Sequence, residues 1–220
     1  MKKISVIITV VLTISILFAA VFMKFRIGDL TVDESKFNDY TVRTLYTADE
    51  KRMKPGKSSK VKDPEFVARV SFAGERTRAY LSTLSKVKVL EVYKGDASMV
   101  GKDIELFESC YFRPKDDVFL PFTYRNLLLK DCEYLVLGNI IINPYSKTED
   151  IKLTYLPTGI ESFRLAKNTD KFFSIDSVHA GEIKFKDVEQ NEFLTANQES
   201  LNEVLAYKDA CFKEYNITVN

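Results

Sequence analysis

The chain has 220 residues, 45% of them hydrophobic and 29% charged, which is the balance of a globular protein of one domain with appendages or of two small domains. Its formal net charge of +1 argues against nucleic-acid binding driven by bulk charge. A single histidine excludes a site with two or more histidine ligands, and three cysteines are too few for a disulfide-stapled miniprotein.

The N-terminal segment predicts one membrane-spanning helix. Residues 4–23, ISVIITVVLTISILFAAVFM, carry no charge, and a helix of that length would be about 30 Å long, which matches the hydrocarbon core of a bilayer. Lys2 and Lys3 precede the run, and a short basic N-terminus favours a cytoplasmic start with the rest of the chain outside. The run is longer than the apolar part of a usual signal peptide, so we expect residues 1–26 to form an uncleaved signal anchor; cleavage would instead give a secreted protein.

Residues 27–63 are expected to form a stalk or linker. The stretch 47–63, TADEKRMKPGKSSKVKD, combines many charges with a Pro-Gly pair and a Ser pair, and such a composition cannot bury enough surface to order itself. It would also suit a cationic patch against anionic lipid or wall polymer. We prefer the solvated linker, because runs of charge usually form one.

A series of short strands is predicted from residue 64 onward. The patterns that indicate them are alternation with period two and apolar runs bounded by turn residues. They cover residues 66–72, 86–93, 103–108, 133–138 and 140–142, with shorter candidates at 151–156 and 172–175. Strands at this spacing are typical of a closed barrel or a sandwich.

The C-terminal segment predicts one amphipathic helix over residues 195–214. Thr195 and Gln198 have the spacing of a capping box. Apolar residues then recur at helical spacing, at Leu201, Val204, Leu205, Cys211, Phe212 and Tyr215. We expect this face to pack against the barrel.

The order of these features resembles the netrin-like family, and most of all the N-terminal domain of the tissue inhibitors of metalloproteinases and their bacterial relatives. The matching pieces are VKVLEVYKGD with Lys94 and Gly95, GKDIELFESC with Cys110, CEYLVLGN with Tyr134 to Gly138, and LTANQESLNEVLAYKDAC with Leu194 to Gln198 and Cys211. The resemblance extends over residues 64–215 and implies an OB barrel flanked by helices. The expected fold is therefore mainly β with α: an OB-like β-barrel plus a packed C-terminal helix over residues 64–220, preceded by one N-terminal transmembrane helix.

One feature of that family is missing from this sequence. In its animal members a mature N-terminal Cys presents its amine and carbonyl to the zinc of the protease, whereas no Cys precedes Cys110 here. The resemblance therefore implies a fold, and a fold alone does not imply a function.

The pairing of the three cysteines stays open. Disulfides are permitted outside the membrane, and a bond between Cys110 and Cys132 would close a loop of about 20 residues, worth about 3 kcal/mol in an entropy model. A bond between Cys211 and Cys110, or three buried thiols, are the alternatives. No signature around any Cys indicates a catalytic pair with His179, the one histidine.

Basic and aromatic residues interleave in the segment 111–127. They include Tyr111, Phe112, Arg113, Tyr124 and Arg125. OB folds often bind sugars or single strands through aromatic residues on loops, so we expect a binding loop here. The alternative is a loop whose rings plug the end of the barrel.

Together these observations predict a non-enzymatic interaction module in the cell membrane, held there through residues 4–23, that binds an extracytoplasmic protein or a cell-wall component. We expect no catalytic residues, no metal, no cofactor and no nucleic-acid partner. The alternative function is inhibition of a protease in the manner of the metalloproteinase inhibitors. It is disfavoured because the zinc-chelating N-terminal Cys is missing.

Overall fold

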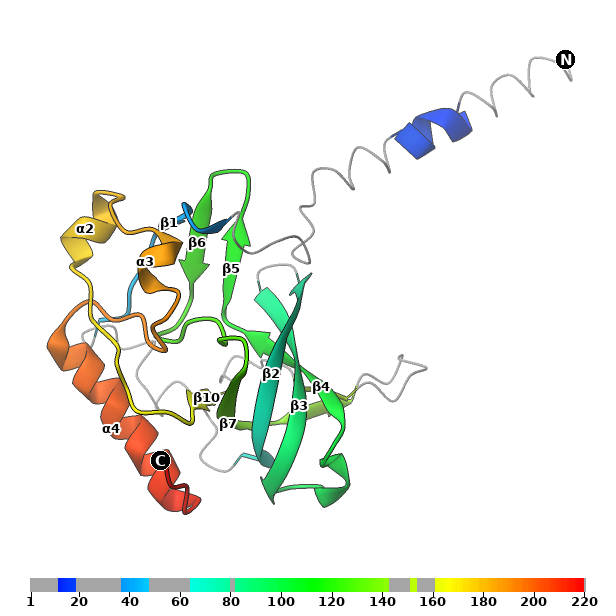
Figure 1. Cartoon of the computed structure of the whole chain (residues 1–220). Coiled ribbons are helices and arrows are strands. Elements are labelled where there is room, and N and C mark those ends of the chain that lie inside the picture. The colour runs from blue at the N-terminus through cyan, green and yellow to red at the C-terminus, as the bar shows by residue number, and fades with distance from the viewer. Residues whose placement is uncertain are drawn as a thin grey trace, which may run out of the picture.

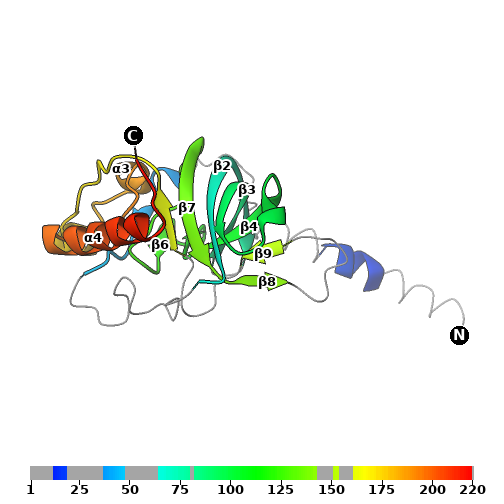
Figure 2. The same ribbon diagram turned by 90° about the horizontal axis from the view of Figure 1, so that it is seen from below.

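The computed structural model describes residues 12–18, 37–47, 64–79, 82–142, 151–153 and 161–219. They form a mainly β structure of two sheets, with short helices and one long C-terminal helix, as Figure 1 and Figure 2 show from two sides. Residues 12–18 are helical and exposed. Within the described ranges, no helix combines the length and apolar character needed to cross a membrane. The rest of the predicted anchor and the linker residues 48–63 lie outside the described residues.

The larger sheet has seven strands in the order β10-β7-β2-β3-β4-β9-β8. Neighbours are antiparallel, except that β4 and β9 are parallel. The strands are β2 (Phe66–Ala79), β3 (Ser82–Lys94), β4 (Asp103–Glu108), β7 (Cys132–Gly138), β8 (Ile140–Ile142), β9 (Ile151–Leu153) and β10 (Glu161–Arg164). Strands are thus confirmed at each position predicted before residue 154, whereas the candidate at 172–175 is coil followed by the first residue of a helix.

Alternation with period two explains which face of the larger sheet is buried. In β4, Ile104, Leu106 and Glu108 point to the interior and the residues between them are more exposed. The pairing of β2 with β3 shifts register between Phe72 and Arg76, and this interval holds a glycine with a φ of +100°. A 3-10 turn, η2 (Ala97–Met99), connects β3 to β4.

A smaller, three-stranded sheet joins segments that are far apart in the sequence. Its hairpin strands are β5 (Cys110–Arg113) and β6 (Val118–Pro121), and β1 (Thr41–Val42) pairs with β6 in parallel. The helices α2 (Ile175–His179) and α3 (Phe185–Val188) share one apolar cluster with this sheet.

Residues 37–47 belong to the folded body, which corrects the expected stalk at 27–63. Val42 is fully buried, and Tyr46 is 1% exposed. The Tyr46 amide donates to the Leu194 carbonyl at 2.9 Å, and its hydroxyl donates to the Glu203 carboxylate at 2.8 Å. This short segment is ordered by backbone pairing with distant parts of the chain.

The predicted C-terminal helix is confirmed as α4 (Gln198–Glu214). It begins three residues after the predicted start at Thr195, because Thr195 is still extended and bridges to the N-terminal segment. The Asn197 side chain caps the helix by accepting from the Ser200 amide at 2.8 Å. The apolar face of α4 packs on β7 and β10 at one end of the larger sheet (Figure 1).

The strand order of the larger sheet has two ends, β10 and β8, so the described strands form an open sheet rather than the predicted closed barrel. One residue, Asn139, separates β7 from β8 along the chain. The run from 132 to 142 therefore pairs with β2 through its first part and with β9 through its second. The Glu65 amide donates to the Asn139 side-chain oxygen at 3.2 Å, which ties this break to the start of β2.

The apolar face of α4 generates the first prediction. The Leu201→Ala variant truncates a side chain that is 4% exposed and leaves a cavity, so it should lower the free energy of unfolding by about 2–5 kcal/mol. Denaturant unfolding of the full chain, followed by circular dichroism, measures this change. The control Asp209→Ala, on the exposed face of α4, should change stability by less than about 0.5 kcal/mol. Equal effects of the two variants would contradict the packing of α4 on the sheet.

Candidate functional site

Four of the five residues predicted to form a binding loop are buried, so they make no exposed binding surface. Tyr111, Phe112, Tyr124 and Arg125 are 5%, 2%, 2% and 8% exposed, and Arg113 alone is exposed. The physical reason is that β5 is covered on both faces, so that consecutive aromatic rings enter the interior. Phe112 and Tyr124 therefore belong to the apolar core, Phe112 in the cluster with α2 and α3 and Tyr124 in the cluster with α4.

All three cysteines are free thiols, so neither predicted disulfide of Cys110 is formed. Burial raises the pKa of Cys110 well above its ordinary value and raises the pKa of Cys211 to about 12. Cys132 differs from the other two because it is half-buried. It is the cysteine whose thiol a reagent in solution can reach.

A buried ion pair joins β2 to β4. The Arg76 Nε atom lies 3.4 Å from Glu108 Oε1, with side-chain exposures of 6% and 5%. The Ser85 hydroxyl on β3 donates to the same carboxylate, so three neighbouring strands meet there. The Leu128 amide donates to Glu108 Oε2 at 2.5 Å, and the Leu128 carbonyl accepts from the Arg76 guanidinium. Both buried charges are thus satisfied by each other and by backbone, as low-dielectric surroundings require.

The irregular segment 126–129 is held in place by side chains from both sides. The Leu129 amide donates to the Tyr134 hydroxyl at 2.6 Å. The Asn126 side-chain nitrogen donates to the Val188 carbonyl, at the end of α3, at 2.7 Å. Since buried backbone groups need partners, these bonds replace the ladder that the segment lacks and fix its path between β6 and β7.

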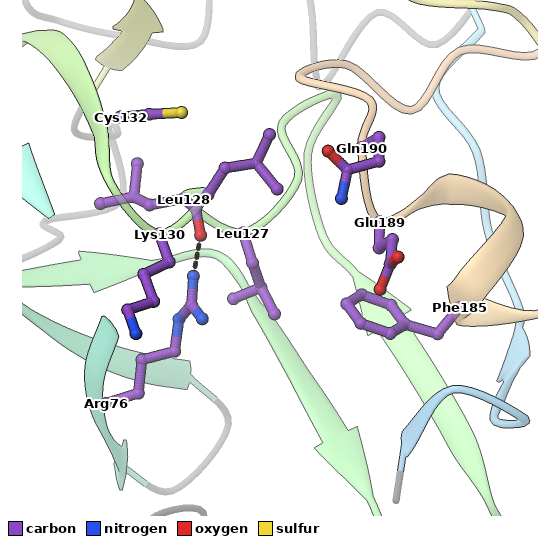
Figure 3. A pocket seen from close by; sticks show the side chains of 9 residues that line it. Arg76, Leu127, Leu128, Lys130, Cys132, Phe185, Glu189 and Gln190 are labelled. Carbon is purple, nitrogen blue, oxygen red and sulfur yellow. Dashed lines mark hydrogen bonds between the residues drawn. The ribbon is translucent and has the colours of Figure 1, made fainter. Parts of the chain in front are cut away.

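A pocket of about 270 Å³ lies between this segment and α3 (Figure 3). The coil 127–130 and Cys132 form one wall, and Phe185, Glu189 and Gln190 form the opposite one. Arg76 completes the lining from β2. The walls therefore come from three stretches of chain that only the fold brings together.

Two charged side chains of the pocket are not used by the fold. Among the described residues, neither the exposed Lys130 nor the half-buried Glu189 has an ion-pair or hydrogen-bond partner. The alkyl stem of Lys130 passes over Gly74, where a Cβ would lie 3.0 Å from Lys130 Cδ. Because Gly74 has no side chain, the stem of Lys130 has room to lie beside the pocket.

A second buried cluster surrounds Glu161 on β10. The Tyr124 hydroxyl donates to Glu161 Oε2, and Arg125 Nε lies 3.8 Å from the same oxygen. Burial raises the pKa of the Glu161 carboxyl and of the Tyr124 hydroxyl. The ion pair with Glu161 on β10 is what stabilises the buried guanidinium of Arg125.

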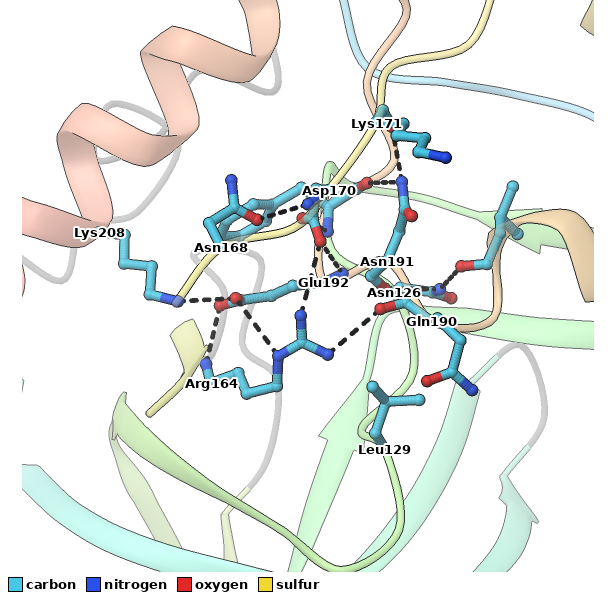
Figure 4. A network of polar contacts seen from close by, with 12 residues as sticks. Asn126, Leu129, Arg164, Asn168, Asp170, Lys171, Gln190, Asn191, Glu192 and Lys208 are labelled. Carbon is cyan, nitrogen blue, oxygen red and sulfur yellow. Dashed lines mark hydrogen bonds and ion pairs between the residues drawn. The ribbon is translucent and has the colours of Figure 1, made fainter. Parts of the chain in front are cut away.

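A third cluster ties α4 to β10 and the coil behind it (Figure 4). Lys208 Nζ donates to Glu192 Oε2 at 2.7 Å, with both side chains 4% exposed. The Arg164 guanidinium lies between Glu192, at 4.0 Å, and Asp170, at 3.6 Å, and donates to the Gln190 carbonyl at 3.2 Å. These four side chains hold the segment that leads into the pocket wall.

Backbone amides and burial set the protonation of the acids in this third cluster. Asp170 accepts from the Glu192 and Phe193 amides at 2.9 and 2.7 Å. Burial raises the pKa of Asp170, and it raises that of Glu192 to about 7 against the opposing effect of Lys208. Glu192 is thus a buried acid that titrates near neutral pH.

The side chains within each of the three buried clusters pair with each other, and those of the first and third also bind backbone groups, so these charges stabilise the fold. The described part of the chain contains no group of three or more His, Cys, Asp or Glu side chains able to hold a metal ion. The pocket, by contrast, is lined by apolar side chains, a cysteine and charges of both signs. Such an arrangement is suited to binding a small polar group.

Sequence reasoning did not single out Lys130 or Glu189 as site residues. Lys130 precedes the turn residue Asp131, whose φ is +60°, and Glu189 follows a helix of four residues. Neither position stands in a motif, and the two are brought to one pocket by the long-range bonds of Asn126. No local signal in the sequence distinguishes them from ordinary surface charges.

Neither a protein-family model nor a curated protein matches this sequence.

The ion pair of Arg76 and Glu108 generates the second prediction. Arg76→Met and Glu108→Gln each leave one group of the pair without its partner, so each should lower the free energy of unfolding by about 3–5 kcal/mol. The double variant should lose less than the sum of the two, because it removes both groups together. A double-mutant cycle by denaturant unfolding measures the difference.

The control for this cycle is Lys186→Met, which breaks a surface ion pair with Asp39 at 2.7 Å. It should leave the free energy of unfolding nearly unchanged, because exposed pairs contribute little. Losses that are additive, or no larger than that of the control, would contradict a structural role for the Arg76 pair.

The raised pKa of Glu192 generates the third prediction, on pH. The folded chain binds this proton more tightly than the unfolded chain, since the pKa rises from 4.5 to about 7. The stabilisation is therefore complete below about pH 4.5 and is lost as the pH rises through 7, by an amount of order 3 kcal/mol. Asp170 and Glu161 act in the same direction.

Glu192→Gln, which stays neutral at every pH, should make the free energy of unfolding fall less steeply between about pH 5 and pH 8. Denaturant unfolding across that range measures the slope. The control Glu182→Gln removes an exposed carboxylate and should keep the native slope. An unchanged slope in Glu192→Gln would show that Glu192 titrates at its ordinary pKa.

Proposed function

We propose that this chain is a membrane-anchored, extracytoplasmic, non-enzymatic interaction module. It binds an extracytoplasmic protein or a cell-wall component in the pocket between the coil 127–130 and α3. The observation that supports this proposal is the pocket itself, which has a volume of about 270 Å³ and is lined by apolar side chains and by charges of both signs (Figure 3).

The walls of the pocket are fixed before any ligand arrives. The carbonyl and amide of Leu128 are bonded to Arg76 and Glu108, and the Leu129 amide is bonded to Tyr134. Asn126 links the same wall to α3 through the Val188 carbonyl. A preformed wall costs little ordering entropy on binding, which favours a recognition role.

We also infer an OB-like topology for the larger sheet. The support is that the run 132–142, interrupted at Asn139 alone, pairs with β2 at one end and with β9 at the other. If β7 and β8 are taken as one strand, the order β2-β3-β4-β9-β8 returns to β2, with β4 and β9 parallel. OB barrels use their strand faces and loops for binding, and the pocket borders β2 and β7 of this sheet.

The proposed location is supported by the uncharged run at residues 4–23 and by the basic residues that precede it. With the run in the membrane, the folded body from residue 37 onward would lie outside the cell, where proteins and wall polymers are the available partners. The alternative of a protease inhibitor is supported by the family resemblance alone.

The fourth prediction tests binding at the pocket on intact cells. A photo-crosslinking residue replaces Gln190, which is exposed and lines the pocket, in the full-length chain produced by its native cells. Illumination should give a covalent adduct of defined size, detected as a mobility shift on a denaturing gel. The same residue at Lys88, exposed on β3 and outside the pocket lining, should give none.

Adducts of equal yield from both positions would mean that capture is unspecific. No adduct from position 190, with the chain present at the cell surface, would contradict the proposed module.

A further inference from the structure

Two opposite charges face one pocket without neutralising each other. Lys130 stands beside Arg76 on one side of the pocket, and Glu189 stands with Gln190 on the other (Figure 3). The described residues contain no ion pair between Lys130 and Glu189, and none of either with a third group. Arg76 is already bonded to the Leu128 carbonyl and to Glu108, so Lys130 is the cation that is available to a ligand.

The position of Lys130 is built into the fold. Its methylene groups lie over Gly74, where any Cβ would come within 3.0 to 3.3 Å of three of its carbons. The φ of Gly74 is +100°, a conformation that residues with side chains rarely adopt. The lysine stem is therefore held against the bulge of β2, which keeps its ammonium group on the Arg76 side of the pocket.

The rest of the lining suits a small ligand with an apolar middle. Leu127 and Cys132, on the wall of Lys130, and Phe185, on the wall of Glu189, add apolar side chains to both sides of the pocket. A volume of about 270 Å³ is just below the ~300–1,000 Å³ of pockets that hold drug-sized ligands, which corresponds to one or two amino-acid residues.

We propose that this pocket binds a short peptide or amino acid with both charges free, its carboxylate at Lys130 and its ammonium group at Glu189. The proposal rests on the proposed function, because it names the ligand class of the same pocket. A ligand with one charge would form an ion pair on one side of the pocket only, and the loss of the second ion pair is the basis of selectivity. The Gln190 amide, on the Glu189 side, supplies a further polar group for the peptide backbone.

Cys132 supplies a direct readout of occupancy. It lines the pocket and is half-buried, whereas Cys110 and Cys211 are buried. Its rate of alkylation by iodoacetamide in the full-length chain, purified in detergent and followed by mass spectrometry, should fall when the pocket is filled. The two buried cysteines report in the same sample whether the fold has opened.

The fifth prediction compares three matched probes in that assay. The dipeptide Ala-Ala carries both charges, N-acetyl-Ala-Ala lacks the ammonium group, and Ala-Ala-amide lacks the carboxylate. Ala-Ala should slow alkylation of Cys132, and each blocked probe should need severalfold more, up to about fivefold, for the same protection, which corresponds to up to about 1 kcal/mol. The result that overturns the proposal is no protection by Ala-Ala, or equal protection by all three probes.

Two variants assign each charge to its side of the pocket. Lys130→Met should bind Ala-Ala and Ala-Ala-amide equally, and Glu189→Gln should bind Ala-Ala and N-acetyl-Ala-Ala equally. The matched controls Lys88→Met and Glu182→Gln, at exposed positions outside the pocket, should keep the native preferences. Native preferences in both pocket variants would overturn the assignment.

Failure of this inference is distinguishable from failure of the proposed function. If Ala-Ala gives no protection while the photo-crosslinking residue at Gln190 still captures a partner on cells, the module stands and the zwitterionic ligand is wrong. If both experiments are negative, the pocket is not a binding site.

Discussion

The carboxylate of Glu108 is the group on which the rest of this structure depends. It accepts from the Ser85 hydroxyl and the Leu128 amide and pairs with Arg76, which in turn donates to the Leu128 carbonyl. One buried ion pair thus holds both backbone groups of a residue in a segment without regular structure. Displacing this segment would break the bonds of Leu128 to Glu108 and Arg76. It would leave buried charges without partners, which is strongly destabilising. That segment connects the small sheet to β7 and forms a wall of the pocket.

Buried charged side chains also bind irregular backbone between β10 and α4. Between β10 and α4 the chain runs mostly as coil and short helices, so its backbone groups lack a ladder. Asp170 accepts from two amides, Glu192 accepts from the Arg164 amide, and Arg164 donates to a carbonyl. Lys208 then joins α4 to this network. Charged side chains are buried here because they form hydrogen bonds to backbone groups that have no partner in a sheet or helix. Their loss of hydration on burial raises the pKa of Glu192.

Local patterns in the sequence predicted most strands and the terminal helix, because alternation in β4 and the spacing on α4 reflect burial directly. They misplaced the binding loop because basic and aromatic residues together are typical of exposed recognition surfaces. The partner that buries Arg125 is Glu161, and the hydroxyl of Tyr124 meets the same carboxylate 37 positions away. The order of residues 37–47 likewise depends on β6 and on residues 183–195, far along the chain. Such pairings are properties of the fold and leave no trace in a window of ten residues.

The division between charges that hold backbone and charges that face the pocket also sets the strength of binding. Lys130 is exposed and Glu189 is half-buried, so each contributes about 0–1 kcal/mol to an ion pair with a ligand in high dielectric surroundings. The apolar side chains of the lining add a few kcal/mol at most, so the total corresponds to a dissociation constant of about 1 mM or weaker. A single free peptide would therefore dwell briefly. A partner that presents the same group many times, or that is held near the membrane with this chain, gains from the high effective concentration. Weak recognition by a fixed pocket is thus consistent with a module whose partner is a polymer or an abundant surface protein.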